Sequence, residues 1–364
     1  MADLPTYTIQ ADTLRNFVTA LFAKAGASED EAARIASHLV TANLTGHDSH
    51  GVIRVPRYIT DARAGQVLFG QSITILGESP VHALLDGNLG FGQTIGEQAV
   101  AVGIEKAKAQ GMSIISLRHS AHLGRIGDWA EQAADAGLIS IHFVNVANLP
   151  MVAPYGGVGR RFSTDPFCIG IPPLPGRPML LLDLATSVVA EGKVLVASNG
   201  GKELPHDALI TPEGHLSADP SVLYGPLVKH ATRSALDGKG AIRAFGDHKG
   251  SGLAFMCEML AAVLGGGANA GPVTGTERRI QNNMLSIYID PAKFAGDSFI
   301  EQAIAYTEYV KSSPPAQGFE EVLVPGEPEA RARASRQAGG IPLQVDTWAT
   351  LCNFAREFGV AIPE

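Results

Sequence analysis

Residues 45 to 58 read TGHDSHGVIRVPRY and gather two histidines, an aspartate, a serine and two arginines. The spacing of His47 and His50 allows two imidazoles to share a metal ion. The same stretch also fits proton transfer, because His50 can exchange a proton with a substrate while Ser49 orients its ring and Arg54 binds a negative charge. Metal binding and proton transfer are therefore the two chemistries to weigh.

A second pair of histidines, His119 and His122, has the same spacing as His47 and His50. Together the two pairs raise a zinc-dependent hydrolase or lyase as one alternative. Both pairs fall in loops interrupted by glycine, and no cysteine is close to either pair in sequence. A catalytic zinc also needs a third protein ligand, and the sequence offers no obvious one. We therefore predict no metal site.

Proton transfer matches the needs of a 2-hydroxy or 2-oxo acid. Such a substrate needs a cation for its carboxylate, and the planar guanidinium of Arg54 can bind it through two parallel hydrogen bonds. Its carbonyl oxygen needs an acid as hydride arrives at the neighbouring carbon, and the imidazole of His50 suits that role. A catalytically silent protein that only binds a small molecule is a further alternative.

The composition indicates a folded, cytoplasmic protein. Apolar residues make up 45% of the 364 residues and charged residues 18%, which is typical of a chain with a large core. The 28 basic and 36 acidic residues give a net charge of −8 without a basic block, so we predict no nucleic-acid partner. The N-terminus lacks the features of a signal peptide, and Glu258 breaks the most apolar stretch, so we predict no membrane segment. The three cysteines are scattered, which favours a reducing compartment: Cys168, Cys257 and Cys352.

Both ends of the chain have helical patterns. Residues 11–25 place apolar side chains on one face and stop at Gly26, and a second helix starts at a capping box formed by Ser28 and Glu31. A third helix begins near Pro56. Helical patterns return near the C-terminus in residues 298–313, 328–337 and 346–359. We predict that the helical ends pack together, as an N-terminal segment of residues 1–71 and a C-terminal segment of residues 313–364.

Between these ends, short apolar runs alternate with helices, which predicts an α/β region over residues 72–312 that binds cofactor and substrate. Residues 248–266 predict a long buried helix because they are apolar on all sides. Gly90, Gly92 and Gly96 resemble a phosphate-binding loop. Ile95 stands where that fingerprint requires its third glycine, and no acidic residue follows at the usual distance, so we interpret the glycines as a turn that starts a helix.

Seven blocks, in order and spread over nearly the whole chain, resemble those of the malate/L-lactate dehydrogenase family. They read GHDSHGVIRVPRY, HSAHLGRIGDWAEQAADAGLISIHFVN, FSTDPF, LLLDLATSVVAEGKV, HKGSGLAFMCEMLA, VPGEPE and GIPL. The resemblance is greatest to the bacterial hydroxycarboxylate dehydrogenases of that family. It implies a mixed α/β fold that is not a Rossmann fold, with a helical lobe from both termini and a central α/β cofactor domain. It also implies an NAD(P)-dependent 2-hydroxyacid dehydrogenase that forms a homodimer.

The resemblance implies a role for each matching residue. His50 matches the family's proton donor and Ser49 its neighbour in the relay, while Arg54 and Thr164 match substrate contacts. The cofactor residues implied in the same way are His122, Gly124, Arg125, Ile126, Leu181, Leu182, Asp183, Leu184, Ala185, His248, Asn282, Gly326, Glu327, Pro328 and Glu329. Of these, His248 opens a helix whose backbone N–H groups suit a phosphate.

One block departs from the imine-reducing members of the family. Those relatives read His-Gly-Asp after the segment DLATS, and the aspartate joins the relay, whereas this chain has Glu191, Gly192 and Lys193. The departure favours a hydroxy-acid substrate. Reduction of an imine of the Δ1-piperideine-2-carboxylate type is the alternative.

The segment that resembles the nucleotide site also bears on the choice of cofactor. NADP carries a 2′-phosphate that needs a cation, whereas the free ribose of NAD favours a carboxylate. Glu327 and Glu329 disfavour the phosphate, while Arg331 and Arg333 follow closely and can bind it. We therefore predict NAD, with NADP as the alternative.

Overall fold

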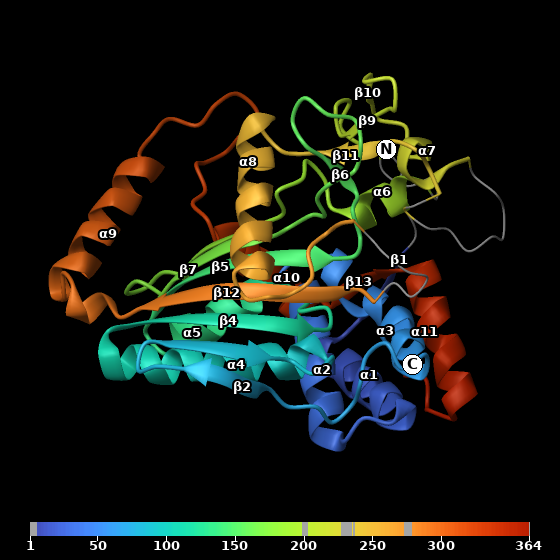
Figure 1. Ribbon diagram of the computed structural model, residues 1–364, viewed down its shortest axis with the longest axis horizontal. Coiled ribbons are helices and arrows are strands. Elements are labelled where there is room, and N and C mark those ends of the chain that lie inside the picture. The colour runs from blue at the N-terminus through green and yellow to red at the C-terminus, as the bar shows by residue number, and fades with distance from the viewer. Residues whose placement is uncertain (1–5, 199–202, 227–234, 236, 273–278, 364) are drawn as a thin grey trace.

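The protein folds around three β-sheets (Figure 1). The computed structural model describes residues 6–198, 203–226, 235, 237–272 and 279–363. The largest sheet contains, in spatial order, β2 (Thr74–Glu78), β3 (His82–Asp86), β4 (Met112–Ser120), β12 (Gln281–Ile289), β5 (Ile139–Ala147), β7 (Phe167–Ile171) and β8 (Leu180–Leu184). β3 and β4 run parallel, and the other neighbours are antiparallel. A mainly antiparallel sheet differs from the parallel sheet of a Rossmann fold, which confirms the predicted fold class.

The central strand, β12, is not evident from the sequence pattern. It begins with polar residues, of which Asn282 and Asn283 are buried. Their side-chain oxygens accept hydrogen bonds from the backbone N–H of Leu123 at 2.7 Å and of His119 at 3.1 Å. These long-range bonds offset the burial of the amides and tie residues 119–123 to the sheet.

Helices α4 (Gly92–Gln110) and α5 (Gly127–Asp135) pack together on one side of the large sheet (Figure 1). Trp129 of α5 is fully buried, and a Cβ on Gly96 of α4 would lie 2.5 Å from its ring. A Cβ on Gly92 would lie 2.2 Å from the carbonyl oxygen of His122. Close packing therefore accounts for these glycines, in agreement with a turn that starts a helix.

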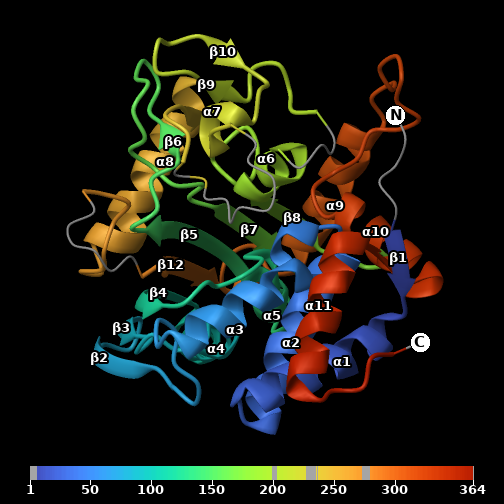
Figure 2. The ribbon, with the colours of Figure 1, turned by 90° about the vertical axis from the view of Figure 1, so that its right-hand side faces the viewer.

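The two ends of the chain form one helical lobe, as predicted (Figure 2). Strand β1 (Thr6–Ile9) pairs with β13 (Ile341–Gln344), and one apolar core joins the helices of both ends. The core contains residues of α1 (Ala11–Ala25), α2 (Glu29–Leu44), α3 (Val55–Arg63) and α11 (Val345–Phe358). Helix α10 (Glu327–Gly339) packs on α2 but has no buried residue of its own. The domain boundaries at residues 71 and 312 stay a prediction.

The capping signal of α2 is half realised. The hydroxyl of Ser28 accepts a hydrogen bond from the backbone N–H of Glu31 at 3.3 Å, as a capping box requires. The Glu31 carboxylate instead accepts from the backbone N–H of Gly70 at 2.9 Å and from the hydroxyl of Thr94 at 3.3 Å. Tertiary contacts therefore take the place of the second half of the box.

A smaller sheet is built from short strands that lie, in sequence, between strands of the large sheet. Its order is β10 (Leu216–Ser217), β9 (Leu209–Ile210), β11 (Ala241–Arg243) and β6 (Val152–Ala153), and it packs with α6 (Glu191–Ser198) and α7 (Ser221–Tyr224). Part of the segment before His248, residues 227–234 and 236, lies outside the described residues.

The predicted long helix is present, but only one of its sides is buried. Helix α8 (His248–Cys257) continues as a π-helical segment (Glu258–Val263) that packs on β5 and β12. On its outer side Phe255 is 53% exposed and Leu264 is 65% exposed. A helix that is apolar on all sides predicts burial within the chain, and here one apolar side is left uncovered. No helix within the described ranges is long and apolar enough to cross a bilayer.

Candidate active site

The loop that carries His50 is held by Asn43, the penultimate residue of α2. The Asn43 side-chain oxygen accepts from the backbone N–H of Val52 at 2.9 Å, and its amide donates to Asp48 at 2.6 Å. A Cβ on Gly51 would lie 2.2 Å from the Asn43 oxygen, so only glycine fits there. Arg336 of α10 donates to both carboxylate oxygens of Asp48, at 2.7 and 3.0 Å. Both ends of the chain therefore fix this loop.

His50 lies in this loop beside three other polar groups. Its Nδ1 lies 3.1 Å from the hydroxyl of Ser49, and its ring stacks on that of His122 with 5.5 Å between ring centroids. Burial, helped by the charges of Arg54 and His47, lowers the pKa of His50 to about 3. The imidazole of His50 is therefore neutral, in its base form, near pH 7.

His122 is oriented by Tyr58, a residue that the sequence analysis missed. The Tyr58 hydroxyl lies 2.6 Å from Nδ1 of His122, and the Gln93 amide donates to that hydroxyl at 3.2 Å. Burial raises the pKa of Tyr58 to about 12, so the phenol keeps its proton and donates it to Nδ1. Burial also holds the pKa of His122 well below its usual value. His122 is therefore a neutral imidazole whose proton sits on Nε2.

Arg54 is positioned between Ser49 and α6. Its Nε donates to the Ser49 carbonyl oxygen at 2.6 Å, and one terminal nitrogen lies 3.8 Å from the carboxylate of Glu191. A Cβ on Gly192 would lie 3.2 Å from Cβ of Ser49, so the turn into α6 touches the His50 loop directly. Lys193 is exposed. Lys193, at the position of the aspartate in the imine-reducing relatives, therefore points to solvent, and Glu191, at the position of their histidine, lies beside the site.

The predicted cofactor loop around Arg125 is rigidly held. Arg125 is buried, and one terminal nitrogen donates to Asp128 at 2.7 Å and to Glu131 at 2.8 Å. Its Nε and its other terminal nitrogen are buried and have no hydrogen-bond partner within the described part of the chain. The backbone N–H of Gly127 donates to Asp183 on β8 at 2.7 Å, which joins two of the predicted cofactor segments. Burial raises the pKa of Asp183.

The GEPE turn, residues 326–329, lies at the beginning of β8. The N–H of Leu181 donates to the Pro325 carbonyl oxygen at 3.3 Å, and a Cβ on Gly326 would lie 2.3 Å from the Met179 carbonyl oxygen. Glu329 lies 3.5 Å from His47, and this hydrogen bond holds the pKa of Glu329 below its usual value. The turn, β8 and the His50 loop therefore meet.

Thr164 and His248 lie near the other end of β8. The Thr164 carbonyl oxygen accepts from the N–H of Thr186 at 2.9 Å, and the Thr186 carbonyl oxygen accepts from Phe245 at 3.0 Å, just before α8. At the start of α8, the N–H groups of Lys249 and Gly250 already donate to backbone carbonyls. Fewer of its N–H groups are therefore open to a phosphate than the sequence predicts.

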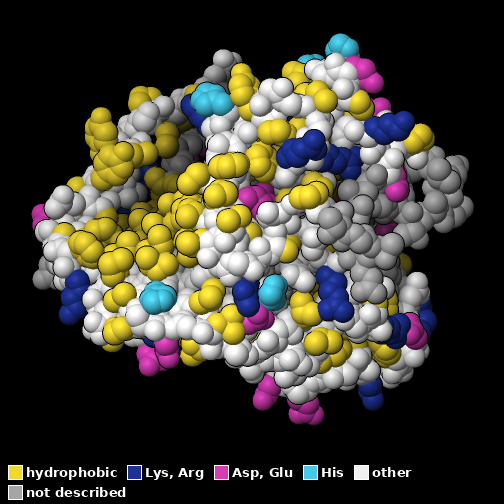
Figure 3. Space-filling view, viewed as in Figure 1, with side chains coloured by type: hydrophobic (Ala, Val, Ile, Leu, Met, Phe, Trp, Pro, Cys, Tyr) yellow, Lys and Arg dark blue, Asp and Glu magenta, His cyan; other side chains and the backbone are white. Residues whose placement is uncertain are grey.

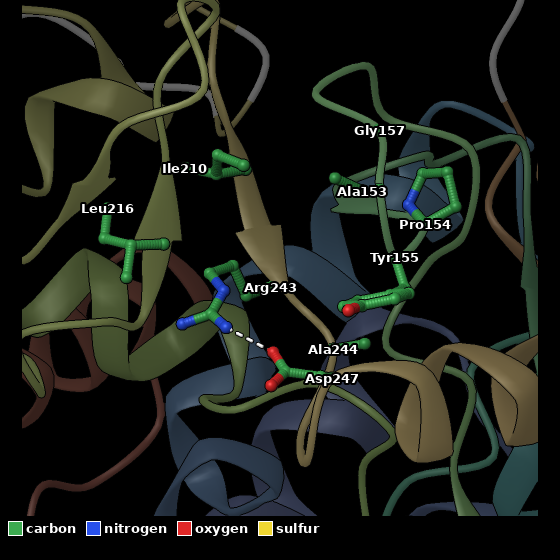
Figure 4. A pocket seen from close by; sticks show the side chains of 10 residues that line it. Ala153, Pro154, Tyr155, Gly157, Ile210, Leu216, Arg243, Ala244 and Asp247 are labelled. Carbon is green, nitrogen blue, oxygen red and sulfur yellow. Dashed lines mark hydrogen bonds and ion pairs between the residues drawn. The ribbon is translucent and has the colours of Figure 1, made fainter.

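A pocket of about 160 Å³ opens beside this helix start (Figure 4). Tyr155 lies at its wall and its ring packs edge-on against His248, with 5.9 Å between ring centroids. Arg243 is the arginine of the pocket wall, and it donates a hydrogen bond to Asp247 of the same wall, so its charge is already paired within the protein. Ile210 lies at the wall as well. Residues of the small sheet line the pocket, and neither His50 nor His122 is part of its wall.

The histidine pairs do not converge on a metal. His119 bonds to Asp86 at 3.0 Å, His47 faces Glu329, and His50 and His122 face Ser49 and Tyr58. Within the described part of the chain, no three histidine, cysteine or acidic side chains are grouped to bind an ion. The arrangement places two buried, neutral imidazoles beside the Arg54 guanidinium on a mixed α/β fold.

Comparison with known proteins identifies the class. The sequence pattern of the malate/L-lactate dehydrogenase family matches residues 9–352, and the chain belongs to this family. Hydroxycarboxylate dehydrogenase B of Escherichia coli O157:H7 is 40% identical over 97% of this chain and 95% of its own length. The chain is thus an oxidoreductase that interconverts 2-hydroxy and 2-oxo acids.

Solved structures agree with this class. Malate dehydrogenase from Pyrococcus horikoshii OT3 superposes with a TM-score of 0.86 at 29% identity, and each chain is covered to 99%. The Δ1-piperideine-2-carboxylate reductase from Pseudomonas syringae pvar. tomato superposes with a TM-score of 0.80 at 27% identity, over 96% of this chain and all of the other. The fold is therefore shared by relatives named for hydroxy acids and for an imine.

Proposed function

We propose that His50 donates and accepts the proton when this enzyme interconverts a 2-hydroxy acid and a 2-oxo acid, with Ser49 as its neighbour in the relay. One observation carries the proposal: the neutral imidazole of His50 is paired with that of His122 and lies beside the Arg54 guanidinium. Hydride transfer requires that a proton leave or reach the substrate oxygen, and a buried imidazole serves that need. Arg54 binds the substrate carboxylate, and Thr164 is a further substrate contact.

A bound nicotinamide cofactor supplies or accepts the hydride. The residues fit such a group, because Arg125 has two buried N–H-bearing nitrogens without a protein partner beside Gly124 and Ile126, and a dinucleotide offers acceptors for them. We propose that the cofactor lies along this loop, β8 and the GEPE turn. The residues that would hold it are His122, Gly124, Arg125, Ile126, Leu181, Leu182, Asp183, Leu184, Ala185, His248, Asn282, Gly326, Glu327, Pro328 and Glu329.

We propose NAD as the preferred cofactor. Both arginines that can serve a 2′-phosphate already have partners, since Arg331 bonds to Glu321 at 2.7 Å and Arg333 bonds to Glu131 at 2.6 and 2.8 Å. Glu329 adds a negative charge at the same turn. A higher kcat/KM with NADPH than with NADH contradicts this assignment.

We propose that the enzyme is a cytoplasmic homodimer that uses the face of α8 and α9 (Asp297–Lys311). Hydrophobic side chains gather between these helices (Figure 3), where Tyr309 is 74% exposed and Phe255 is 53% exposed. A large exposed apolar patch is typical of a protein interface. Light scattering at micromolar concentration tests this, and a monomer overturns it. The described cysteines are free and buried, which fits a reducing compartment.

The test of the proposed reaction is a panel of 2-oxo acids and one cyclic imine, assayed by oxidation of NADH and NADPH. We expect turnover of 2-oxo acids, and we expect the rate to be unchanged after exhaustive removal of metal ions with a chelator. Turnover of the imine alone supports the imine-reductase alternative. Loss of activity on chelation and its return with zinc overturns the proton-transfer mechanism.

A further inference from the structure

Glu191 lies against the arginine proposed to bind the substrate carboxylate. One of its carboxylate oxygens accepts from the Tyr224 hydroxyl, and the other lies 3.8 Å from a terminal nitrogen of Arg54. The Nε of Arg54 is fixed on the Ser49 carbonyl oxygen at 2.6 Å, so the guanidinium cannot turn away. A separation of 3.8 Å is an ion pair without a hydrogen bond, which leaves the terminal nitrogens able to bind a carboxylate.

The other arginines near the imidazoles are also matched with carboxylates. The charges of Arg54, Arg57 and Arg125 act on His50 or His122. Arg57 lies 3.4 Å from Asp61, and Arg125 lies 2.7 Å from Asp128. Among the residues that the structure describes, each arginine that acts on this imidazole pair therefore faces a carboxylate, and Lys193 is exposed on the first turn of α6.

We infer that Glu191 selects substrates with a single carboxylate and rejects 2-oxo and 2-hydroxy acids that carry a second one. The first carboxylate binds Arg54, whose charge Glu191 already balances, so the occupied site carries a net negative charge. A second carboxylate on the substrate meets Glu191 and, among the residues that the structure describes around the imidazoles, no arginine without a partner. Juxtaposition of like charges is a common means of excluding a wrong ligand.

This inference rests on the proposed function and narrows its substrate class. Glu191 is a specificity-determining residue, because it acts on the side chain of the substrate and not on the transferred proton. A purely structural role, through its bond to Tyr224, predicts an equal effect of substitution on every substrate. The two roles therefore predict different ratios of kcat/KM between substrates with one and with two carboxylates, and the experiment measures these ratios.

The experiment compares pairs of 2-oxo acids of equal chain length with the purified enzyme and NADH. The pairs are 2-oxobutanoate with oxaloacetate and 2-oxopentanoate with 2-oxoglutarate. We expect the wild type to favour the single-carboxylate member of each pair at least about 10-fold in kcat/KM. In Glu191→Gln, which keeps an acceptor for Tyr224, we expect this preference to fall about 10-fold, mainly through a lower KM for the dicarboxylates.

Glu213→Gln is the matched control, since it removes one exposed carboxylate at the turn between β9 and β10 and should leave the ratios unchanged. The wild-type ratios need no variant, so a poorly folded Glu191→Gln leaves the inference testable. A wild type that prefers the dicarboxylates overturns it, as does an equal effect of Glu191→Gln on both members of each pair. If no 2-oxo acid is turned over at all, the proposed function fails instead.

Discussion

The rings of His50 and His122 stack with 5.5 Å between centroids and 13° between planes, although 72 residues separate them in sequence. Each ring is neutral because burial lowers its pKa, and a charge on His50 would lower the pKa of His122 further. Protonation of both rings at once is therefore strongly disfavoured. This is a suitable property for a site that exchanges one proton per turnover.

Substitution of His50 should separate proton transfer from cofactor binding. We expect His50→Ala to lower kcat for 2-oxo acid reduction by about 10²- to 10⁴-fold, the usual contribution of a general acid. The affinity for NADH, measured by fluorescence titration, should change little. His122→Gln is the comparison, because it removes the stacked imidazole. If His122→Gln abolishes proton transfer while His50→Ala leaves it intact, the assignment of the proton donor is wrong.

The two directions of the reaction should respond differently to pH. The pKa of His50 is lowered to about 3, so the base form is already present at pH 5 to 8 in the free enzyme. Titration of His50 should therefore cause no change with pH in kcat/KM for hydroxy-acid oxidation over this range. Reduction needs the protonated ring, whose fraction falls about tenfold per pH unit above the pKa, so kcat/KM for reduction should fall with rising pH. An oxidation profile that declines below a pKa near 6.5 would contradict a buried, neutral His50.

Removal of the Arg54 guanidinium should weaken ground-state binding. Its charge-assisted hydrogen bonds act on the substrate carboxylate in ground and transition states alike, so Arg54→Ala should raise KM for 2-oxo acids about 10- to 100-fold with a smaller change in kcat. Steady-state kinetics with 2-oxobutanoate measure both constants. The double variant Arg54→Ala/Glu191→Gln should recover part of the loss, because the unbalanced carboxylate at residue 191 is then gone. An unchanged KM in Arg54→Ala excludes it as the carboxylate ligand.

The sequence predicts the helices of the lobe well because their signals are local. The apolar face of α1 and the left-handed Gly26 that ends it are both readable from periodicity and residue type. By contrast, β12 begins with amides whose partners, the N–H groups of Leu123 and His119, come from far along the chain. The first three residues are therefore polar although two of them are buried, and only the second half of the strand, MLSIYI, has an apolar pattern. The strands of the small sheet are too short, at two or three residues, to show alternation.

Some residues of the candidate site can likewise be identified from local sequence, whereas others are brought together only by tertiary packing. The sequence brings His50, Ser49 and Arg54 together because they are neighbours in one loop. Tyr58 lies four residues after Arg54 on the helix that follows, and this spacing is the signal that could have identified it. The approach of Glu191 to Arg54 depends on the packing of α6 against the His50 loop, which no local pattern reports.

A buried histidine outside the site should control acid stability. His142 lies between the hydroxyls of Ser286 at 2.8 Å and Ser140 at 3.0 Å, and burial lowers its pKa to about 3. The unfolded chain protonates this ring below about pH 6.5, whereas the folded protein does not, so stability is lost as pH falls from 6.5 toward 3. Between pH 7 and pH 5 the wild type should therefore lose about 2 kcal/mol of unfolding free energy through this ring alone. His142→Asn lacks the ring, so its loss over the same range should be smaller by that amount. Exposed His215→Asn is the control, and an equal drop in all three proteins contradicts the prediction.

Substitution of Gly103 by alanine tests packing against helix propensity, because the two effects change the stability of the protein in opposite directions. It lies inside α4, where alanine normally stabilises a helix by about 1 kcal/mol relative to glycine. A Cβ at this position would lie 2.2 Å from the ring of Tyr288, which is fully buried on β12 and cannot withdraw. Overpacking of this kind costs roughly 1–3 kcal/mol, so Gly103→Ala should lower the denaturant midpoint. Gly339→Ala, at the end of α10 with no heavy atom within 4 Å of its Cβ, should leave stability equal or higher. A Gly103→Ala protein as stable as the wild type would show that α4 can move away from the sheet, and the tight packing of this helix on β12 would be wrong.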